Sequence, residues 1–120
     1  MPHLTIEYTD NLPQFDADQA LLALNQALVA SGQFEEEVDI KSRAVRLHTF
    51  LVGTSPGGRA FVHAKLAILS GRSLETKQAL SKDLLGALHT ACVWPPGLHV
   101  QLCVEVQEIE RASYAKMAVG

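Results

Sequence analysis

Residues 61–75, FVHAKLAILSGRSLE, place a strand, a turn and the start of a helix in direct succession. Over residues 61–69 the apolar side chains at even positions share one face, which is typical of a half-buried β-strand. The Ser-Gly-Arg sequence at 70–72 predicts a turn. Ser73 can then cap a helix, and the carboxylate of Glu75 suits the positive end of that helix's dipole. This segment therefore predicts a strand followed directly by a helix, and the rest of the fold is predicted from this β-α unit.

The segment downstream completes a β-α-β unit. Leucines recur at helical spacing after Ser73, and the Pro-Pro-Gly sequence at 95–97 predicts the end of that helix. Four apolar residues then alternate with other residues and predict a final strand: Val100, Leu102, Val104 and Val106. A short tail follows from residue 111.

The first half of the chain has the same order of elements. Apolar residues at alternate positions over residues 4–9 predict a strand close to the N-terminus. Asp16 or Asp18 can cap the helix that follows, whose leucines lie on one face. After an acidic linker at 35–37, residues 40–52 form a long run with the composition of a strand.

Two consecutive β-α-β units predict an α+β fold with a four-stranded mixed sheet and two helices on one of its faces. Within each unit the strands are expected to be parallel, because a helix joins them through a right-handed crossover. The short turn between the units predicts an antiparallel hairpin of residues 40–52 with residues 61–69. We expect a single domain with these parts: the whole chain at 1–120, a pseudo-repeat of 2–52 and 60–108, and a C-terminal tail at 111–120.

One face of this sheet is expected to lack a covering layer. It still carries apolar residues, among them Phe61, Ala67 and Leu69. A monomer that exposed such a face would tend to aggregate. We therefore expect a homo-oligomer, a trimer or another closed ring.

Composition and charge narrow the class of partner. The chain has 120 residues, 48% of them hydrophobic, and a net charge of −3, which argues against nucleic acid or an anionic membrane surface as the main partner. A small anionic ligand stays compatible with this charge. No apolar stretch approaches the roughly 18 residues of a membrane helix, and the start lacks the features of a secretory signal. We expect a cytoplasmic protein in which Cys92 and Cys103 are free thiols.

Pro2 is the first candidate for chemistry. Removal of Met1 would leave a free secondary amine, which is a base when neutral. Burial and nearby cations both lower the pKa of an amine and would keep it neutral near pH 7. The alternative is that Pro2 merely follows the initiator residue, and the pattern by itself favours that alternative.

Three cationic residues are candidates for binding an anionic substrate. Arg72 lies at the expected helix N-terminus, where backbone N–H groups and the helix dipole suit a carboxylate or phosphate, although a solvated arginine in a turn is equally compatible. Lys41 and Arg43 share one face of their strand, whereas Arg46 lies on the other. A solvated strand edge is the alternative for this pair.

The histidines do not predict a metal centre. The five histidines have no metal-ligand spacing, and we expect neither a metal nor a cofactor. His48 and His63 flank the expected hairpin and could meet across it. No phosphate-binding loop or Ser-His-Asp arrangement can be recognised either.

Five short motifs together resemble the 5-carboxymethyl-2-hydroxymuconate isomerase family of the tautomerase superfamily, over a range from Pro2 to about Glu110. They are Met-Pro-His at 1–3, Thr-Asp-Asn at 9–11, Ile-Lys-Ser-Arg at 40–43, Phe-Val-His at 61–63 and Gly-Arg-Ser-Leu-Glu at 71–75. The family usually has an arginine where this chain has Lys41, and Arg43 matches a second family arginine. The two side chains are not equivalent where a planar, bidentate contact is needed.

The resemblance implies a trimeric, cofactor-free isomerase in the bacterial degradation of homoprotocatechuate. Its substrate would be a dienol with three carboxylates, which becomes the conjugated keto isomer. Pro2 would carry a proton from the hydroxyl group to a carbon of the diene. Arg72 would hold a carboxylate or stabilise the enolate oxygen, with Lys41 and Arg43 as further substrate-binding residues. We expect Pro2 to lie at the floor of a cleft lined by Arg72 and by Lys41 or Arg43.

Two other functions are compatible with the sequence. A related tautomerase acting on a simpler enol such as phenylpyruvate would need one carboxylate contact instead of several. A non-catalytic oligomeric binding module could also have this fold. An occluded Pro2, or an Arg72 turned away from any pocket, would indicate the binding module.

Overall fold

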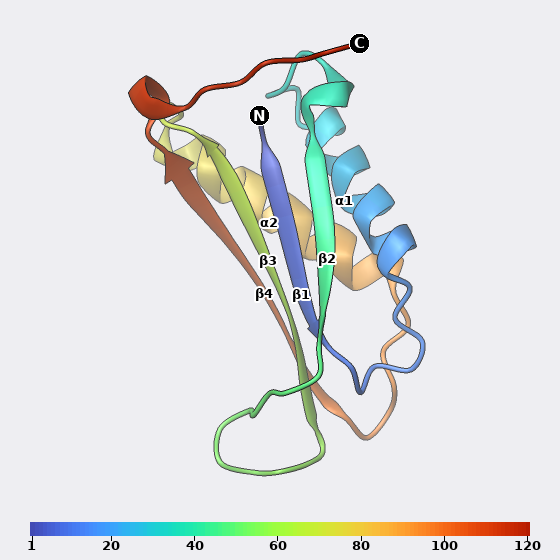
Figure 1. Ribbon diagram of the computed structural model, residues 1–120. Helices are drawn as coiled ribbons and strands as arrows, with labels where there is room; N and C mark the ends of the chain where they lie inside the picture. The colour runs from blue at the N-terminus through green and yellow to red at the C-terminus, as the bar shows by residue number, and fades with distance from the viewer.

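The computed structural model describes residues 1–120 as a four-stranded sheet with two helices packed on one face (Figure 1), which confirms the predicted α+β class. The strands are β1 (His3–Thr9), β2 (Lys41–Leu47), β3 (Arg59–Leu69) and β4 (His99–Ile109). The helices are α1 (Ala17–Ala30) and α2 (Leu74–Ala91), with the short 3-10 turns η1 (Glu37–Asp39) and η2 (Arg111–Ser113). Neither helix combines the length and the apolar character that crossing a membrane requires.

The strand order is β2-β1-β3-β4. β1 and β2 are parallel, as are β3 and β4, so the prediction for each β-α-β unit is confirmed. The predicted hairpin between the units is wrong, because β3 pairs antiparallel with β1 and leaves β2 at the edge. The helix-facing residues of β2 include Ser42 and Arg46, which suit an edge strand better than a buried central one. The loop at 48–58 is long enough to carry the chain past the end of β1.

The changed strand order also separates the two histidines that were expected to meet. His48 Nδ1 lies 2.7 Å from the carboxylate of Asp10. His63 faces β1 and β4 instead, and its Nε2 lies 2.7 Å from the carboxylate of Glu105. The two rings therefore belong to different ion pairs.

Both helices begin at capping residues that the sequence predicts. Asp16 is the N-cap of α1, and its carboxylate accepts a hydrogen bond of 3.1 Å from the backbone N–H of Gln19. Ser73 is the N-cap of α2, and its hydroxyl accepts one of 3.2 Å from the backbone N–H of Thr76. Each cap satisfies a backbone donor that a helix would otherwise leave free.

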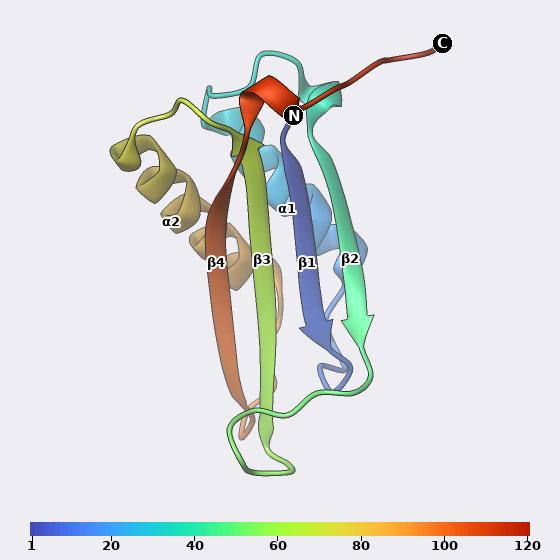
Figure 2. The same cartoon turned by 60° about the vertical axis from the view of Figure 1, so that its left-hand side comes forward.

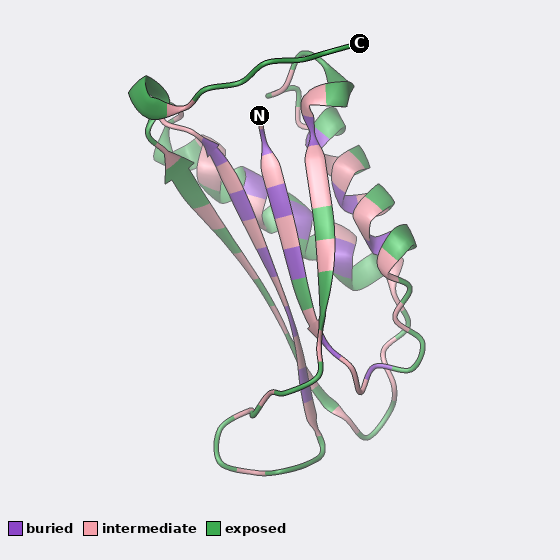
Figure 3. Cartoon of the chain, in the orientation of Figure 1, coloured by how far each residue is buried: buried purple, intermediate pink, exposed green.

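The core fills the space between the helices and the sheet (Figure 3). Its buried residues come from the inner faces of β1 and β3 and from one stripe on each helix: Leu4, Ile6, Ala60, Val62, Ala64, Leu66, Ile68, Ala20, Leu24, Leu28, Leu80, Leu84 and Leu88. The alternation of β3 and the leucine spacing of both helices thus place apolar surface on one side of the sheet.

The opposite face of the sheet is uncovered (Figure 2). Phe61, Ala67 and Leu69 lie on it and stay half-exposed, as expected from the alternation. Phe50 from the loop after β2 packs edge-to-face on Phe61, with ring centroids 6.4 Å apart. The chain therefore leaves a partly apolar sheet face open to contacts.

Candidate active site

The amino terminus lies where β1 and β2 begin side by side (Figure 1). Pro2 is buried, and its carbonyl accepts a hydrogen bond of 3.1 Å from the backbone N–H of Lys41. The pKa of the Met1 amine is lowered from 8.0 to about 6, by burial first, and then by a hydrogen bond and the positive charge of Lys41. Lys116 lowers this pKa further and Asp39 opposes the shift. An amine at this position is therefore largely neutral at pH 7 and can act as a base.

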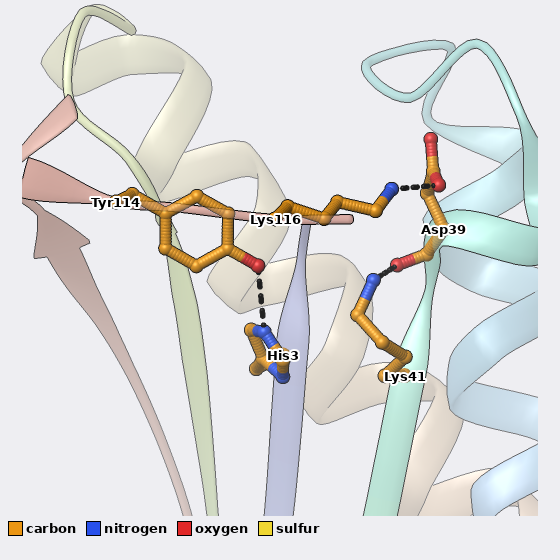
Figure 4. Close-up of polar contacts among 5 residues, drawn as sticks. All are labelled: His3, Asp39, Lys41, Tyr114 and Lys116. Atoms are coloured by element: carbon orange, nitrogen blue, oxygen red, sulfur yellow. Dashed lines mark hydrogen bonds and ion pairs between the residues drawn. The ribbon is translucent and has the colours of Figure 1, made fainter. Parts of the chain in front are cut away.

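A cluster of cations and one carboxylate surrounds this end of the sheet (Figure 4). The ammonium of Lys41 donates to the backbone carbonyl of Asp39, and the ammonium of Lys116 donates to the Asp39 carboxylate. The hydrogen bond with Lys116 lowers the pKa of the Asp39 carboxyl, so the carboxylate is ionised at neutral pH. Including the terminal amine, basic groups outnumber the acid here, which suits an anionic ligand.

His3 connects Arg43 to the C-terminal tail. Its Nδ1 lies 2.8 Å from Nη2 of Arg43, and its Nε2 lies 3.1 Å from the hydroxyl of Tyr114. Because a guanidinium can only donate, Nδ1 must accept and Nε2 carries the proton toward Tyr114. Burial, followed by the charges of Arg43 and Lys41, lowers the pKa of His3, in agreement with a neutral ring. Arg43 therefore joins the cluster through His3.

Arg72 takes part in a different set of contacts. Its Nε and Nη2 donate to the side-chain and backbone oxygens of Gln33 at 3.2 and 2.8 Å, and its guanidinium lies 4.8 Å from the ring centroid of Phe34. Burial and then the charge of Arg111 lower the pKa of Arg72. Arg111 itself donates to the backbone carbonyl of Ser70. Neither guanidinium has a carboxylate partner, so both charges lack a counter-ion.

The four predicted site residues are thus only partly brought together. Lys41 lies beside the terminal amine, and Arg43 is one contact further away. Arg72 instead contacts Gln33 and Phe34 on the loop that follows α1. None of the surface cavities of the chain is lined by any of the four. The expected cleft is therefore not formed by the single chain. A buried Pro2 and an Arg72 outside every cavity are the features expected of a non-catalytic binding module, unless a neighbouring subunit completes the site.

Sequence reasoning missed four residues of the cluster around the amine: His3, Asp39, Tyr114 and Lys116. Tyr114 and Lys116 lie in the tail after β4, where no periodicity indicates which way the chain turns. Asp39 forms part of η1, directly before β2. Its position two residues before Lys41 was the one feature of the sequence that could have placed Asp39 near the site.

The structure contains no group of three or more His, Cys, Asp or Glu side chains that could hold a metal ion. The pair formed by His63 and Glu105, with Glu7 at 4.0 Å from the ring, lies on the open sheet face. It is an ion-pair cluster away from the amino terminus.

Residues 2–119 match the family of 5-carboxymethyl-2-hydroxymuconate isomerase. The 5-carboxymethyl-2-hydroxymuconate Delta-isomerase of Escherichia coli is 32% identical over 91 residues, which cover 75% of this chain and 71% of that protein. A crystal structure of a 5-carboxymethyl-2-hydroxymuconate isomerase from Deinococcus radiodurans R1 has a TM-score of 0.83 at 32% identity, covering 97% of this chain and 88% of the other.

A more distant structure, a fused 4-OT wild-type symmetric trimer, shares the fold with a TM-score of 0.74 at 19% identity, covering 95% of this chain and 90% of the other. The family match spans nearly the whole chain, and the fold agrees with it. The chain therefore belongs to the 5-carboxymethyl-2-hydroxymuconate isomerase family and is an isomerase of the tautomerase superfamily.

Proposed function

We propose that the chain is a cofactor-independent tautomerase that converts 5-carboxymethyl-2-hydroxymuconate into its conjugated keto isomer. In this proposal Met1 is removed and the amine of Pro2 is the general base. The observation that carries it is the pKa of about 6 for the terminal amine, set by burial and by neighbouring lysines. The same surroundings would act on the Pro2 amine, which lies deeper than that of Met1. We further propose that the enzyme acts in the cytoplasm, in homoprotocatechuate degradation.

The proposed reaction moves one proton and shifts the double bonds. The neutral Pro2 amine takes the proton of the dienol hydroxyl, and the oxygen becomes an enolate. The ammonium then delivers a proton to the far carbon of the diene, which leaves a ketone conjugated with the remaining double bond. An anionic substrate opposes the effect of the lysines and raises the amine's pKa on binding, which makes the protonated amine easier to form.

The cations provide contacts for the carboxylates of the substrate. Lys41 lies beside the amine and Arg43 is one contact further away, and both are proposed to hold the nearer groups. Arg72 is proposed to bind a further carboxylate or the enolate oxygen, because its guanidinium is held in place by Gln33 and has no counter-ion. Since the single chain has no cleft around these residues, we propose that a neighbouring subunit completes it.

A tautomerase for a simpler enol such as phenylpyruvate is the second candidate. The separate location of Arg72 favours it, because Lys41 and Arg43 suffice for one carboxylate. Turnover of the dienol triacid and of phenylpyruvate, followed by ultraviolet absorbance on one enzyme preparation, tests both proposals. A preparation that turns over neither the dienol triacid nor phenylpyruvate would favour a non-catalytic binding module.

The assembly is proposed to be a homotrimer, formed over the open sheet face. Its support is the partly apolar surface around Phe61, Ala67 and Leu69, together with the trimeric state named for a structure of the same fold. Sedimentation equilibrium at micromolar concentration is expected to give three times the chain mass of 13.0 kDa. A stable monomer at that concentration would contradict the proposal.

Replacing Lys41 is expected to shift the pH dependence of turnover. Burial is the first cause of the lowered pKa of the terminal amine and Lys41 the next, so Lys41→Met should raise that pKa only part of the way toward 8.0. Because the base works only when deprotonated, the acid limb of kcat/KM should move to higher pH and activity below pH 7 should fall.

Lys41→Arg is the matched control, because it keeps the positive charge and should leave the acid limb in place. If Lys41 limits binding where the family has an arginine, the restored bidentate contact should also raise activity on the triacid. If Arg43 already makes that contact, activity should stay near the wild-type level. An acid limb that does not move in Lys41→Met would mean that Lys41 does not act on the base.

A further inference from the structure

The C-terminal tail crosses the end of the sheet at which the amino terminus lies. After β4 and η2, residues 114–116 run from the β4 side of the sheet toward η1 and β2, above the start of β1 (Figures 1 and 4). Two contacts hold the tail there, from Tyr114 to His3 at 3.1 Å and from Lys116 to the carboxylate of Asp39. We call residues 114–116 the strap.

The strap brings a positive charge close to the candidate base. Lys41 and Lys116 both donate to Asp39, to its backbone carbonyl and to its carboxylate, so the two ammonium groups lie near each other at the amino terminus. In agreement with this placement, Lys116 is among the groups that lower the pKa of the terminal amine. Its side chain is 41% exposed, and that of its partner Asp39 is 35% exposed. An ion pair with this exposure contributes little to stability, and it can be exchanged for another at small cost.

We propose that Lys116 is a specificity-determining residue that binds a carboxylate of the substrate. In the empty site Asp39 holds its ammonium, and on binding the ammonium leaves Asp39 for the incoming carboxylate. One ion pair replaces another, and the flexible lysine stem allows the movement. This proposal rests on the proposed function, because it concerns ligand binding beside the Pro2 amine.

The charges of the site support the assignment. A substrate with three carboxylates needs several cationic contacts, whereas Lys41 is the only other cation that acts on the amine and Arg43 lies one contact further away through His3. Lys116 adds a second ammonium group beside the amine, next to that of Lys41. Tyr114 is a positioning residue in this arrangement, because its hydroxyl ties the strap to His3 and so keeps Lys116 over the amine.

The test compares Lys116→Met with Lys82→Met. Methionine keeps the length of the lysine stem and removes its charge. Lys82 is exposed on α2 and has no ion-pair partner, so its replacement reports any general effect of losing one positive charge. Calorimetric binding of propane-1,2,3-tricarboxylate and of phenylpyruvate is measured for both variants, for Lys116→Arg and for the wild type, with turnover of the dienol triacid alongside.

We expect Lys116→Met to weaken tricarboxylate binding and raise KM for the triacid about tenfold, the usual effect of losing one charge-assisted contact. Binding of phenylpyruvate should change less than threefold, Lys82→Met should resemble the wild type, and Lys116→Arg should recover most of the tricarboxylate affinity because it keeps the positive charge. Tricarboxylate affinity that is unchanged in Lys116→Met, or absent in the wild type, would overturn the proposal. Binding that depends on Lys116 without any turnover would uphold the carboxylate site and count against the proposed function alone.

Discussion

Removal of Met1 is expected to raise kcat/KM for the dienol triacid by two orders of magnitude or more. While Met1 is attached, the nitrogen of Pro2 is part of an amide, and its lone pair is delocalised and not basic. Once Met1 is gone, the same nitrogen is a secondary amine in a buried position beside Lys41. A well-placed general base contributes about 10²- to 10⁴-fold to the rate, which sets the expected size of the effect.

The experiment uses two forms of one sequence. Protein that retains Met1 is treated with a purified methionine aminopeptidase, and intact mass shows the fraction that has been processed. Pro2→Ala, processed in the same way, keeps an amine at the same place and should lose less activity than the form with Met1. The Met1 amine also has a pKa of about 6, so the unprocessed form has a base of suitable strength at a different place. Comparing the two forms therefore tests the position of the base as well as its basicity. Equal kcat/KM for both forms would show that Pro2 is not the base.

Alternation and helix capping predicted the elements of the fold, although the strand expected over 40–52 ends at Leu47. The even positions of β3 are buried as predicted, and Ser73 caps α2. The order of the strands was harder to predict. Alternation shows which residues of a strand share a face, but it does not show which strands are neighbours in the sheet. The polar residues on the helix-facing side of β2, Ser42 and Arg46, were the available sign that this strand lies at the edge.

The candidate site was predicted less completely than the fold. Lys41 could be placed near Pro2, since adjacent parallel strands begin at the same edge of the sheet. The contacts of the strap depend on the path of a non-repetitive tail, which local sequence does not determine. The pairing of Arg72 with Gln33 joins two loops that are far apart in sequence, and it could be found only after the helices were packed.

Arg72→Ala is expected to lower kcat about a hundredfold while changing stability little. The guanidinium is already oriented by Gln33 and Phe34, so it could meet a developing oxyanion without reorganising. Loss of one such donor costs on the order of 3 kcal/mol in the transition state, which corresponds to the hundredfold effect. In the folded protein the substitution removes partly exposed contacts worth about 1 kcal/mol, as urea unfolding would show.

Two further variants separate the role of Arg72 in catalysis from its role in the fold. Arg72→Lys keeps the charge and loses the planar fork, so it should recover only part of the activity if the contact is bidentate. Gln33→Leu removes the side-chain acceptor of Arg72 and leaves the guanidinium in place, so it should affect stability as much as activity. All three variants are assayed on the triacid and on phenylpyruvate. Full activity of Arg72→Ala on both substrates would mean that Arg72 only joins two loops, and that the site around Pro2 binds its substrate with Lys41, Arg43 and the strap.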